Sequence, residues 1–263
     1  MHVARGASFA FAALLACAAL AAPATAQQLP TRTLTLCFED IDVPPWRSLD
    51  HSGLNFELLN EAGRRAGIRL SYVAKPWQRC QSELRSNRVD GMFALSYVPE
   101  RRAIGHYPPD AQSSGNYRLF SGGYDLVRRA GSAVDFDGRS ITGLTMPVGS
   151  QPGYSIAADL RRSGYEVDDG SRDPRTLLRK LAAGRIDAAA LGSNVLSALQ
   201  VSQPALFIGL EKVSTPLVRK DYFLMLSNAL VESDPVLANR LWQAIVDVRD
   251  SESYQAREQA ATR

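Results

Sequence analysis

The chain alternates between short apolar runs and amphipathic segments of helical period. In the first part, the predicted helix 54–66 carries Phe56, Leu59, Ala62 and Ala66 on one stripe and ends before Gly67. The predicted strands of this part are 33–38, 68–73 and 89–95, and a second helix is predicted at 77–86. Strands that alternate with helices in this way predict a parallel sheet with crossover helices, hence an α/β fold.

The alternation stops after Ala111 and then resumes. Glycine- and serine-rich turns flank two extended segments, 117–120 and 124–128. Beyond them the pattern predicts strands at 140–146, 165–167 and 186–191, and helices at 153–163 and 174–183. Further extended runs are predicted at 205–210 and 222–226, and an amphipathic helix opens at Asp234-Pro235. The chain therefore contains two α/β units.

One stretch of the sequence occurs twice. LRSNRVDGMFALS (84–96) reappears without a gap as LAAGRIDAAALGS (181–193), with Leu, Arg, Val or Ile, Asp and the final Ser at the same offsets. A short repeat of this kind also arises by chance from a shared helix–turn–strand pattern. Ser96 and Ser193 both stand where a strand ends, however, and that edge of a parallel sheet is where ligands bind. We expect the two serines on opposite walls of one cleft.

Residues 1–26 are typical of a secretory signal peptide. Arg5 supplies a positive start, a long apolar run follows, and Ala24-Thr25-Ala26 forms a small-residue cleavage site. The segment that ends at Cys17 loosely resembles a lipoprotein box, which leaves lipidation of Cys17 as the alternative. No later segment holds enough unbroken apolar residues to span a bilayer, so we expect an exported, soluble mature chain.

Cysteine content indicates a disulfide, and the net charge bears on the class of partner. Once the signal peptide is removed, Cys37 and Cys80 remain as an even pair in an oxidising compartment. We expect them to form a disulfide, which contributes about 4 kcal/mol for a loop of this length; two buried free thiols are the alternative. The formal net charge of +3 is mild and the basic residues are scattered, so we expect no nucleic-acid partner.

Four segments carry a resemblance to a known family: LTLCFEDIDVPPW, GLNFELLNEAGRRAG, ELRSNRVDGMFALSYVPERR and LLRKLAAGRIDAAAL. Over residues 33–259 the chain resembles the periplasmic solute-binding proteins of family 3, the polar amino-acid-binding type. The resemblance implies the type II periplasmic-binding-protein fold, in which two α/β lobes, joined by two extended crossovers, close on a solute. Lobe 1 would comprise 27–122 and 218–263, lobe 2 would comprise 123–217, and the crossovers would lie near 120–126 and 213–222. A periplasmic monomer is implied as well.

Arg101 is the first ligand-binding residue that the resemblance implies. It ends the segment SYVPER, from which relatives clamp the ligand carboxylate, and a guanidinium offers a carboxylate two parallel donors. Ser96 would donate to the same group. Val98 and Ala94 replace residues that are often threonine and polar in the family, so this wall, Ala94 included, carries few hydroxyl groups. The alternatives are a surface arginine and a turn serine.

Three more candidates come from the first lobe. Trp46 follows Pro44-Pro45, where relatives commonly place an aromatic residue, and Trp77 opens a helix at a position that faces the ligand in relatives. Their rings can bury area or stack on a ring or cation. Asp40 could meet a cationic group of the ligand. Ordinary packing of the tryptophans and a turn cap at Asp40 are the alternatives.

The second lobe offers a turn and a strand end. Gly149-Ser150-Gln151 resembles the turn that opens a helix and presents N–H groups to an anion, so Ser150 and Gln151 are ligand candidates. Gly192 and Ser193 are candidates at the strand end. Relatives that bind amino acids usually carry an aspartate at the position of Gly192, where it pairs with the ligand ammonium. Because Gly192 departs from this pattern, two ligand classes remain: an amino acid, or a carboxylate without an amine.

The resemblance implies a binding protein that delivers a small carboxylate-bearing solute to an ABC transporter permease. A sensor protein that presents its closed form to a membrane receptor is the second hypothesis, and a dehydratase-like enzyme on the same fold is the third. The mature chain has only His51 and His106, both in loop-like segments, and no recognisable catalytic pair. Because no metal or phosphate-loop motif is present either, we expect no metal and no cofactor.

Overall fold

The computed structural model describes residues 1–2 and 32–262. Apart from residues 1–2, the predicted signal peptide, and with it Cys17, lies outside the described residues. Within the described part, no helix is long and apolar enough to cross a membrane. Residues 32–262 contain every helix and strand that the structure describes.

The first lobe is built on three parallel strands. β1 (Thr33–Glu39) lies between β2 (Arg69–Lys75) and β3 (Gly91–Ser96) and pairs with both in parallel. The helices of this lobe are α1 (Leu54–Arg65), α2 (Trp77–Arg85), α6 (Asn228–Ser233), α7 (Pro235–Arg249) and α8 (Glu252–Thr262). A short 3₁₀ helix, η1 (Pro99–Ala103), follows β3. The apolar stripe of α1 packs on α7, and this contact forms the centre of the lobe's core.

The second lobe is also built on three parallel strands, which are shorter. β7 (Val148–Gly149) pairs in parallel with β8 (Val167–Asp168) and with β9 (Ala188–Gly192). Its helices are α3 (Ser155–Arg162), α4 (Pro174–Ala182) and α5 (Ser193–Ser202). A separate small sheet joins β5 (Asp135–Phe136) to β6 (Ile141–Thr142), and β10 (Leu210–Lys212) pairs with β4. Two buried clusters of their own fill this lobe.

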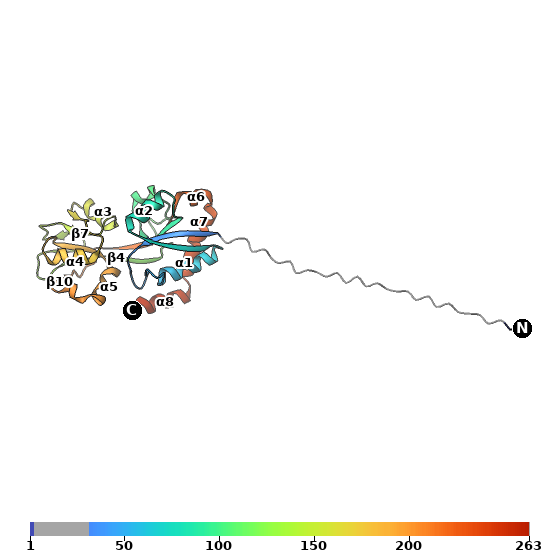
Figure 1. The fold of residues 1–263 in the computed structure, drawn as a ribbon. Coiled ribbons are helices and arrows are strands. Elements are labelled where there is room, and N and C mark those ends of the chain that lie inside the picture. Colours follow the sequence, from blue (N-terminus) through green and yellow to red (C-terminus); the bar gives the residue numbers. More distant parts are fainter. Residues whose placement is uncertain (3–31, 263) are drawn as a thin grey trace. The chain divides into compact units, whose positions relative to one another are not determined.

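Two long strands connect the lobes. β4 (Phe120–Arg129) and β11 (Val218–Leu226) pair with each other in antiparallel register, and β11 also pairs with β3 while β4 pairs with β9. The main sheet therefore has the path β2-β1-β3-β11-β4-β9-β7-β8. Figure 1 shows β4 between the helices of the first lobe and α3, α4 and α5 of the second. The predicted α/β class with two lobes and two extended crossovers is confirmed. The boundaries of the lobes, 27–122 with 218–263 and 123–217, stay a proposal.

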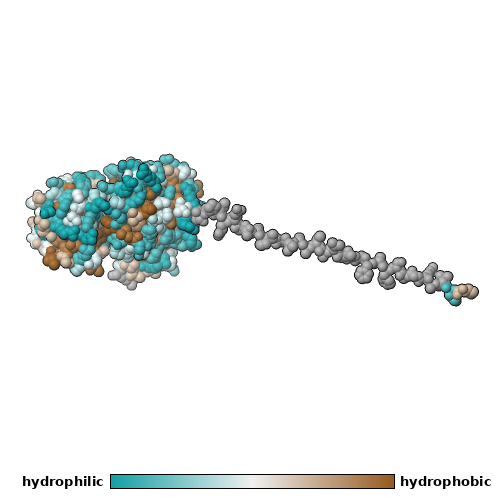
Figure 2. Space-filling model, in the orientation of Figure 1, coloured by the Kyte–Doolittle hydropathy of each residue, from teal (hydrophilic) through white to brown (hydrophobic). Residues whose placement is uncertain are grey.

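Two predicted strands differ in the structure. In 140–146 only Ile141–Thr142 is extended in a ladder, because the backbone N–H groups of Thr145 and Met146 donate to the Asp187 carboxylate. In 205–210 the chain forms a 3₁₀ turn, Pro204–Phe207, and the following Gly209 has a φ of +73°. Helices α5, α6 and α8 were not predicted. Figure 2 shows a mostly hydrophilic face on which apolar residues form small groups.

The aspartates of the sequence repeat have the same structural use in both lobes. Asp90 accepts from the backbone N–H of Thr35 at 2.7 Å, just as Asp187 accepts from Thr145 at 2.6 Å. Each carboxylate thus holds the backbone of an adjacent segment beside its own strand. The repeat therefore marks the start of two equivalent strands, β3 and β9.

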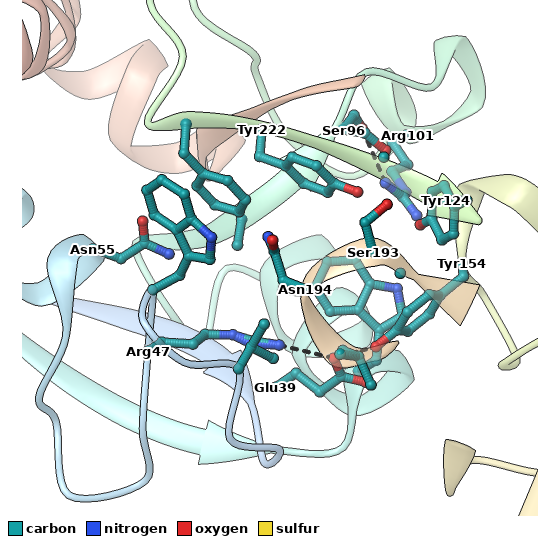
Figure 3. A pocket seen from close by; sticks show the side chains of 18 residues that line it. Glu39, Arg47, Asn55, Ser96, Arg101, Tyr124, Tyr154, Ser193, Asn194 and Tyr222 are labelled. Carbon is teal, nitrogen blue, oxygen red and sulfur yellow. Dashed lines mark hydrogen bonds and ion pairs between the residues drawn. The ribbon is translucent and has the colours of Figure 1, made fainter. Parts of the chain in front are cut away.

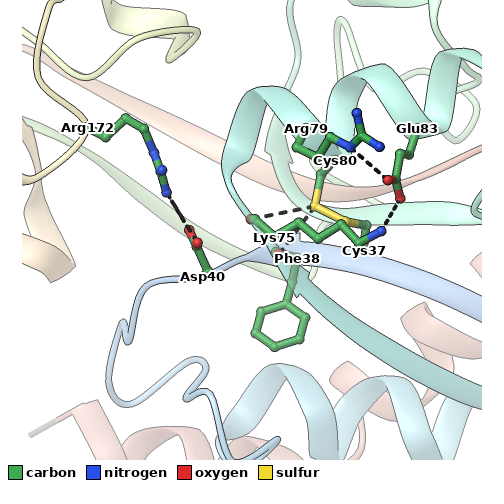
Figure 4. The surroundings of a disulfide bond; sticks show 8 residues. All are labelled: Cys37, Phe38, Asp40, Lys75, Arg79, Cys80, Glu83 and Arg172. Atoms are coloured by element: carbon green, nitrogen blue, oxygen red, sulfur yellow. Dashed lines mark hydrogen bonds and ion pairs between the residues drawn. A yellow bond between two sulfur atoms is a disulfide. The ribbon is translucent and has the colours of Figure 1, made fainter.

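The predicted disulfide is present. Cys37 in β1 and Cys80 in α2 are bonded, with their Cα atoms 5.6 Å apart, and both are fully buried (Figure 4). On the same helix, Glu83 pairs with Lys75 and Arg79. The bond fixes α2 to β1, whose last residue, Glu39, lines a cavity.

Candidate functional site

A cavity lies where the carboxyl ends of β1 and β3 meet the start of α5 and the segment before α3 (Figure 3). Its volume is about 70 Å³, which suits a compact solute because about 10–15 Å³ measured this way holds one water molecule. Aromatic side chains and a few polar groups form its walls. The predicted site residues that line it are Trp46, Trp77, Ala94, Ser96, Arg101, Gly192 and Ser193.

Arg101 is buried in this wall. It lies in η1, the short helix that follows β3, with 7% of its surface exposed, and its guanidinium lies 5.3 Å from the centre of the Trp77 ring. Nη1 donates to the backbone oxygen of Ser96 at 3.0 Å, and Nη2 donates to that of Gly153 at 2.9 Å. A guanidinium carries five N–H groups, so these two bonds leave further donors for a ligand. An arginine in an apolar wall is a strong attractor for an anion.

Ser96 and Ser193 line the same cavity. Ser96, 3% exposed, donates its hydroxyl to Ser155 Oγ at 2.9 Å across the lobes. Tyr124 lies 3.4 Å from the same Ser155 oxygen, and burial raises the pKa of Tyr124, so its phenol remains a neutral group. Both repeated serines thus line one cavity, and their position on opposite walls stays a prediction.

Ala94 has an unusual backbone. Its φ is +63°, and the ladder between β3 and β11 shifts register beside it, so Ala94 is the extra residue of a β-bulge. A bulge bends a strand and re-aims the residues that follow. Here it turns the end of β3, with Ser96, toward the cavity.

An ion pair that sequence reasoning missed lies in the cavity wall. Glu39 Oε2 accepts from Arg47 Nη2 at 3.0 Å and from the Tyr154 hydroxyl at 2.5 Å. Burial, and then the Glu39 charge, hold the pKa of Tyr154 well above its ordinary value, so the phenol stays a donor. The sequence contains no signal that separates Glu39 from its neighbour Asp40; in the structure Glu39 is the buried last residue of β1, and Asp40 follows the strand.

Three aromatic rings form the opposite wall. Trp46 stacks on Phe120 with ring centres 4.3 Å apart, and Phe120 stacks on Tyr222 at 4.7 Å. Trp77 lies across the cavity and donates its Nε1 to the Gly153 oxygen at 3.0 Å. Both predicted tryptophans therefore contribute to the lining, Trp46 from the loop after β1 and Trp77 from the first turn of α2.

The first turn of α5 closes the cavity from the second lobe. Gly192 precedes the helix, and Ser193 and Asn194 begin it; all three line the cavity. A Cβ added at position 192 would lie 3.8 Å from the Val195 methyl group. The backbone there thus has room for a Cβ, and the neighbouring Asn194 supplies a neutral amide to the lining.

Three predicted site residues lie outside this lining. Asp40 forms an ion pair of 2.9 Å with Arg172 at the edge between the lobes. Gln151 donates its amide to the Arg172 backbone oxygen, and Ser150 is fully buried beneath the turn. Of these three residues only Asp40 makes its contact between the lobes, because Gln151 bonds within the second lobe and Ser150 Oγ has no hydrogen-bond partner. Within residues 32–262, no three His, Cys, Asp or Glu side chains gather in a metal-binding arrangement.

Comparison with known proteins was made by sequence and by structure. No protein-family model matches the chain, and no curated protein matches it. Among solved structures, the GluR0 ligand-binding core from Nostoc punctiforme in complex with L-glutamate is similar, with a TM-score of 0.66 and 19% identity over 87% of this chain and 98% of that one. A histidine kinase sensor domain with similarity to periplasmic binding proteins has a TM-score of 0.70 and 20% identity over 88% of this chain and 96% of that one.

A third similar structure is an ancestral arginine-binding protein bound to glutamine. Its TM-score is 0.65 at 16% identity, over 87% of this chain and 97% of that one. These likenesses cover nearly the whole described chain, and they establish its fold. The chain has the fold of the periplasmic binding proteins, with two lobes and a cavity between them.

Proposed function

We propose that this chain is a periplasmic solute-binding protein that captures a small carboxylate-bearing solute, an amino acid or a related acid, between its lobes. The observation that carries the proposal is the position of Arg101. It is a buried cation that is bonded to the Ser96 backbone, in an aromatic-walled cavity that Ser193 also lines. Proteins of similar fold that were solved with bound L-glutamate or glutamine support the same ligand class.

In the proposed mechanism, the two lobes close on the solute. The carboxylate accepts from Arg101 of the first lobe and from the Ser96 hydroxyl, which turns from Ser155 to the ligand, while Ser193 and the start of α5 contact it from the second lobe. Each charge-assisted bond is worth about 1.5–3 kcal/mol. Contacts that require both lobes favour the closed form, and this preference is the signal that a membrane partner reads.

We propose an ABC transporter permease as that partner. A sensory receptor is the second candidate, because one similar fold is the sensor domain of a histidine kinase. Uptake of the identified solute separates the two, since loss of the protein abolishes uptake in the first case and only a regulatory response in the second. An enzyme of the dehydratase type would instead convert the solute, which NMR of an overnight mixture would detect.

The direct test is a thermal-shift screen of the purified protein. The panel comprises amino acids, their deaminated analogues, polyamines and aromatic acids. We expect carboxylates to raise the melting temperature in a concentration-dependent way, because a ligand that binds only the folded state stabilises it. Polyamines without a carboxylate should have no effect. Stabilisation by polyamines alone would reject the proposal.

A further inference from the structure

Unpaired polar atoms gather at one end of the cavity. Among the described residues, six buried side-chain nitrogen and oxygen atoms lack a hydrogen-bond partner, and four of them belong to three cavity residues. These four are Trp46 Nε1, Arg47 Nη1, Asn55 Nδ2 and Asn55 Oδ1. The concentration of unpaired groups in one wall indicates a site for a ligand rather than a general packing defect.

Asn55 is the clearest member of this group. It is the second residue of α1, it is 0% exposed, and its backbone N–H donates to the Trp46 oxygen at 2.8 Å. Both ends of its side-chain amide are unpaired, so the conclusion is the same whichever way the amide is turned. A buried amide in this condition costs free energy, which a ligand with complementary groups recovers.

The charges at this end of the cavity determine which group fits. Arg47 already neutralises Glu39 through its Nη2, so the subsite has no net positive charge to attract an anion. A ligand carboxylate bound to Arg47 would share that guanidinium with the Glu39 carboxylate, and it has no N–H group to donate to Asn55 Oδ1. A carboxamide is neutral, and its oxygen can accept from Trp46 Nε1, Arg47 Nη1 or Asn55 Nδ2 while its N–H donates to Asn55 Oδ1.

Figure 3 shows Asn55 and Arg101 at opposite ends of the lining. We propose that the cavity has two polar subsites, and that the ligand is a short carboxylate whose other end is a neutral primary carboxamide held by Asn55, Arg47 and Trp46. This inference rests on the proposed function, because the Arg101 end supplies the carboxylate grip. It adds the chemical class of the far end of the ligand.

Matched ligands test the inference. Asparagine, aspartate and leucine have nearly the same shape but end in a carboxamide, a carboxylate and two methyl groups; succinamate, succinate and 4-methylpentanoate do the same without the amine. We expect calorimetry to show the carboxamide binding at least about tenfold more tightly than both partners in at least one set, as two recovered hydrogen bonds imply.

A variant pair ties that preference to the subsite. Asn55→Leu has similar volume and no amide, and it should reduce the preference for carboxamide over the methyl analogue to less than about twofold. Asn60→Leu is the matched control, because Asn60 lies on the same helix but is exposed and outside the cavity; it should keep the preference. The ligand comparison on the unaltered protein remains decisive if Asn55→Leu does not fold.

The outcomes separate this inference from the proposed function. If the methyl or dicarboxylate analogue binds as tightly as the carboxamide, the second subsite is wrong while carboxylate capture stands. If Asn55→Leu and Asn60→Leu reduce the preference equally, Asn55 does not hold the ligand and the inference is overturned. If no carboxylate of either set, or of the wider screen, binds at all, both are overturned.

Discussion

Tyr154 donates a hydrogen bond of 2.5 Å to Glu39 Oε2, and thereby joins the residue before α3 in the second lobe to the last residue of β1 in the first. The bond closes the cavity beside Trp77, whose ring centre lies 5.9 Å from that of Tyr154. Because Glu39 is also paired with Arg47, one carboxylate anchors a contact within the first lobe and a contact between the lobes. The Tyr154–Glu39 hydrogen bond thus joins the two lobes directly, and we refer to it as the latch.

We expect Tyr154→Phe to weaken ligand binding without unfolding either lobe. A hydrogen bond to a charged acceptor contributes about 1.5–3 kcal/mol, and its loss favours the open form, so the dissociation constant should rise about tenfold or more by calorimetry. Tyr165→Phe is the control, because the Tyr165 hydroxyl accepts from the Ile141 N–H inside the second lobe. Equal weakening in the two variants would contradict a latch.

Arg101→Met should abolish the thermal shift that carboxylates produce. The methionine keeps an aliphatic stem beside Trp77 but removes every donor. The ligand-free protein should also lose about 1–3 kcal/mol of unfolding free energy, because the backbone oxygens of Ser96 and Gly153 each lose one of their two donors and keep only Tyr107 and Trp77, respectively. Arg102→Met, at the exposed neighbouring position, should change neither quantity. A full ligand-induced shift in Arg101→Met would show that the carboxylate binds elsewhere.

Gly192→Asp should increase affinity for α-amino acids over their deaminated analogues. The new side chain has room, since a Cβ would meet only Val195 at 3.8 Å, and the backbone at Gly192 has a φ of −57° that any residue adopts. Aspartate also caps a helix favourably at this position. Gly192→Asn is the matched neutral control, and competition calorimetry with leucine and 4-methylpentanoate is the measurement. An equal gain in Asp and Asn variants would rule out pairing with the ammonium.

Removal of the disulfide should cost up to about 4 kcal/mol of unfolding free energy. Cys37 and Cys80 are 43 positions apart, and a cross-link over a loop of that length restricts the unfolded chain by about this amount. The comparison is urea unfolding of the unaltered protein and of Cys37→Ala/Cys80→Ala. A reductant should lower the midpoint of the first and leave that of the second unchanged. A reductant effect on both would have another cause.

The sequence predicted those features of the site that depend on strand ends. Ser96 and Ser193 follow buried apolar runs, and parallel strands bring their carboxyl ends to a common edge, so the strand pattern indicated them. Arg101 and Gly192 were indicated by the resemblance to family 3, and all four residues line the cavity. The long amphipathic helices α1 and α7 were also predicted. The apolar residues that pack these two helices on each other recur along the sequence with the helical period.

The other residues of the site are distinguished by their burial, which the pattern of apolar and polar residues in the sequence does not reveal. Glu39 and Asp40 are neighbours of the same charge, yet one is inside the cavity wall and the other pairs with Arg172 at its edge. Asn55 reads as an ordinary residue of a first helical turn until its full burial is known. Helix α5 has an apolar composition without a clear stripe, and for that reason it was not predicted.

Asp187 gives the second lobe an acid-sensitive support. Burial of its carboxyl raises the pKa, but hydrogen bonds from Arg129 and from Thr145 and Met146 outweigh that effect and lower the pKa to about 2. A pKa below the value of about 3.9 in the unfolded chain means that the stabilisation is present above pH 4 and is lost as the pH falls toward 2. The amount is about 2 kcal/mol.

Asp187→Asn should therefore be less stable than the unaltered protein at neutral pH, and the difference should shrink as the pH falls from about 4 to 2. In this range the unaltered carboxylate takes up its proton and loses the charge that attracts Arg129. Urea unfolding at pH 6, 4, 3 and 2.5 provides the difference in free energy at each pH. A difference that stays constant over this range would show that the hydrogen bonds of the side chain, rather than its charge, hold the segment before β7.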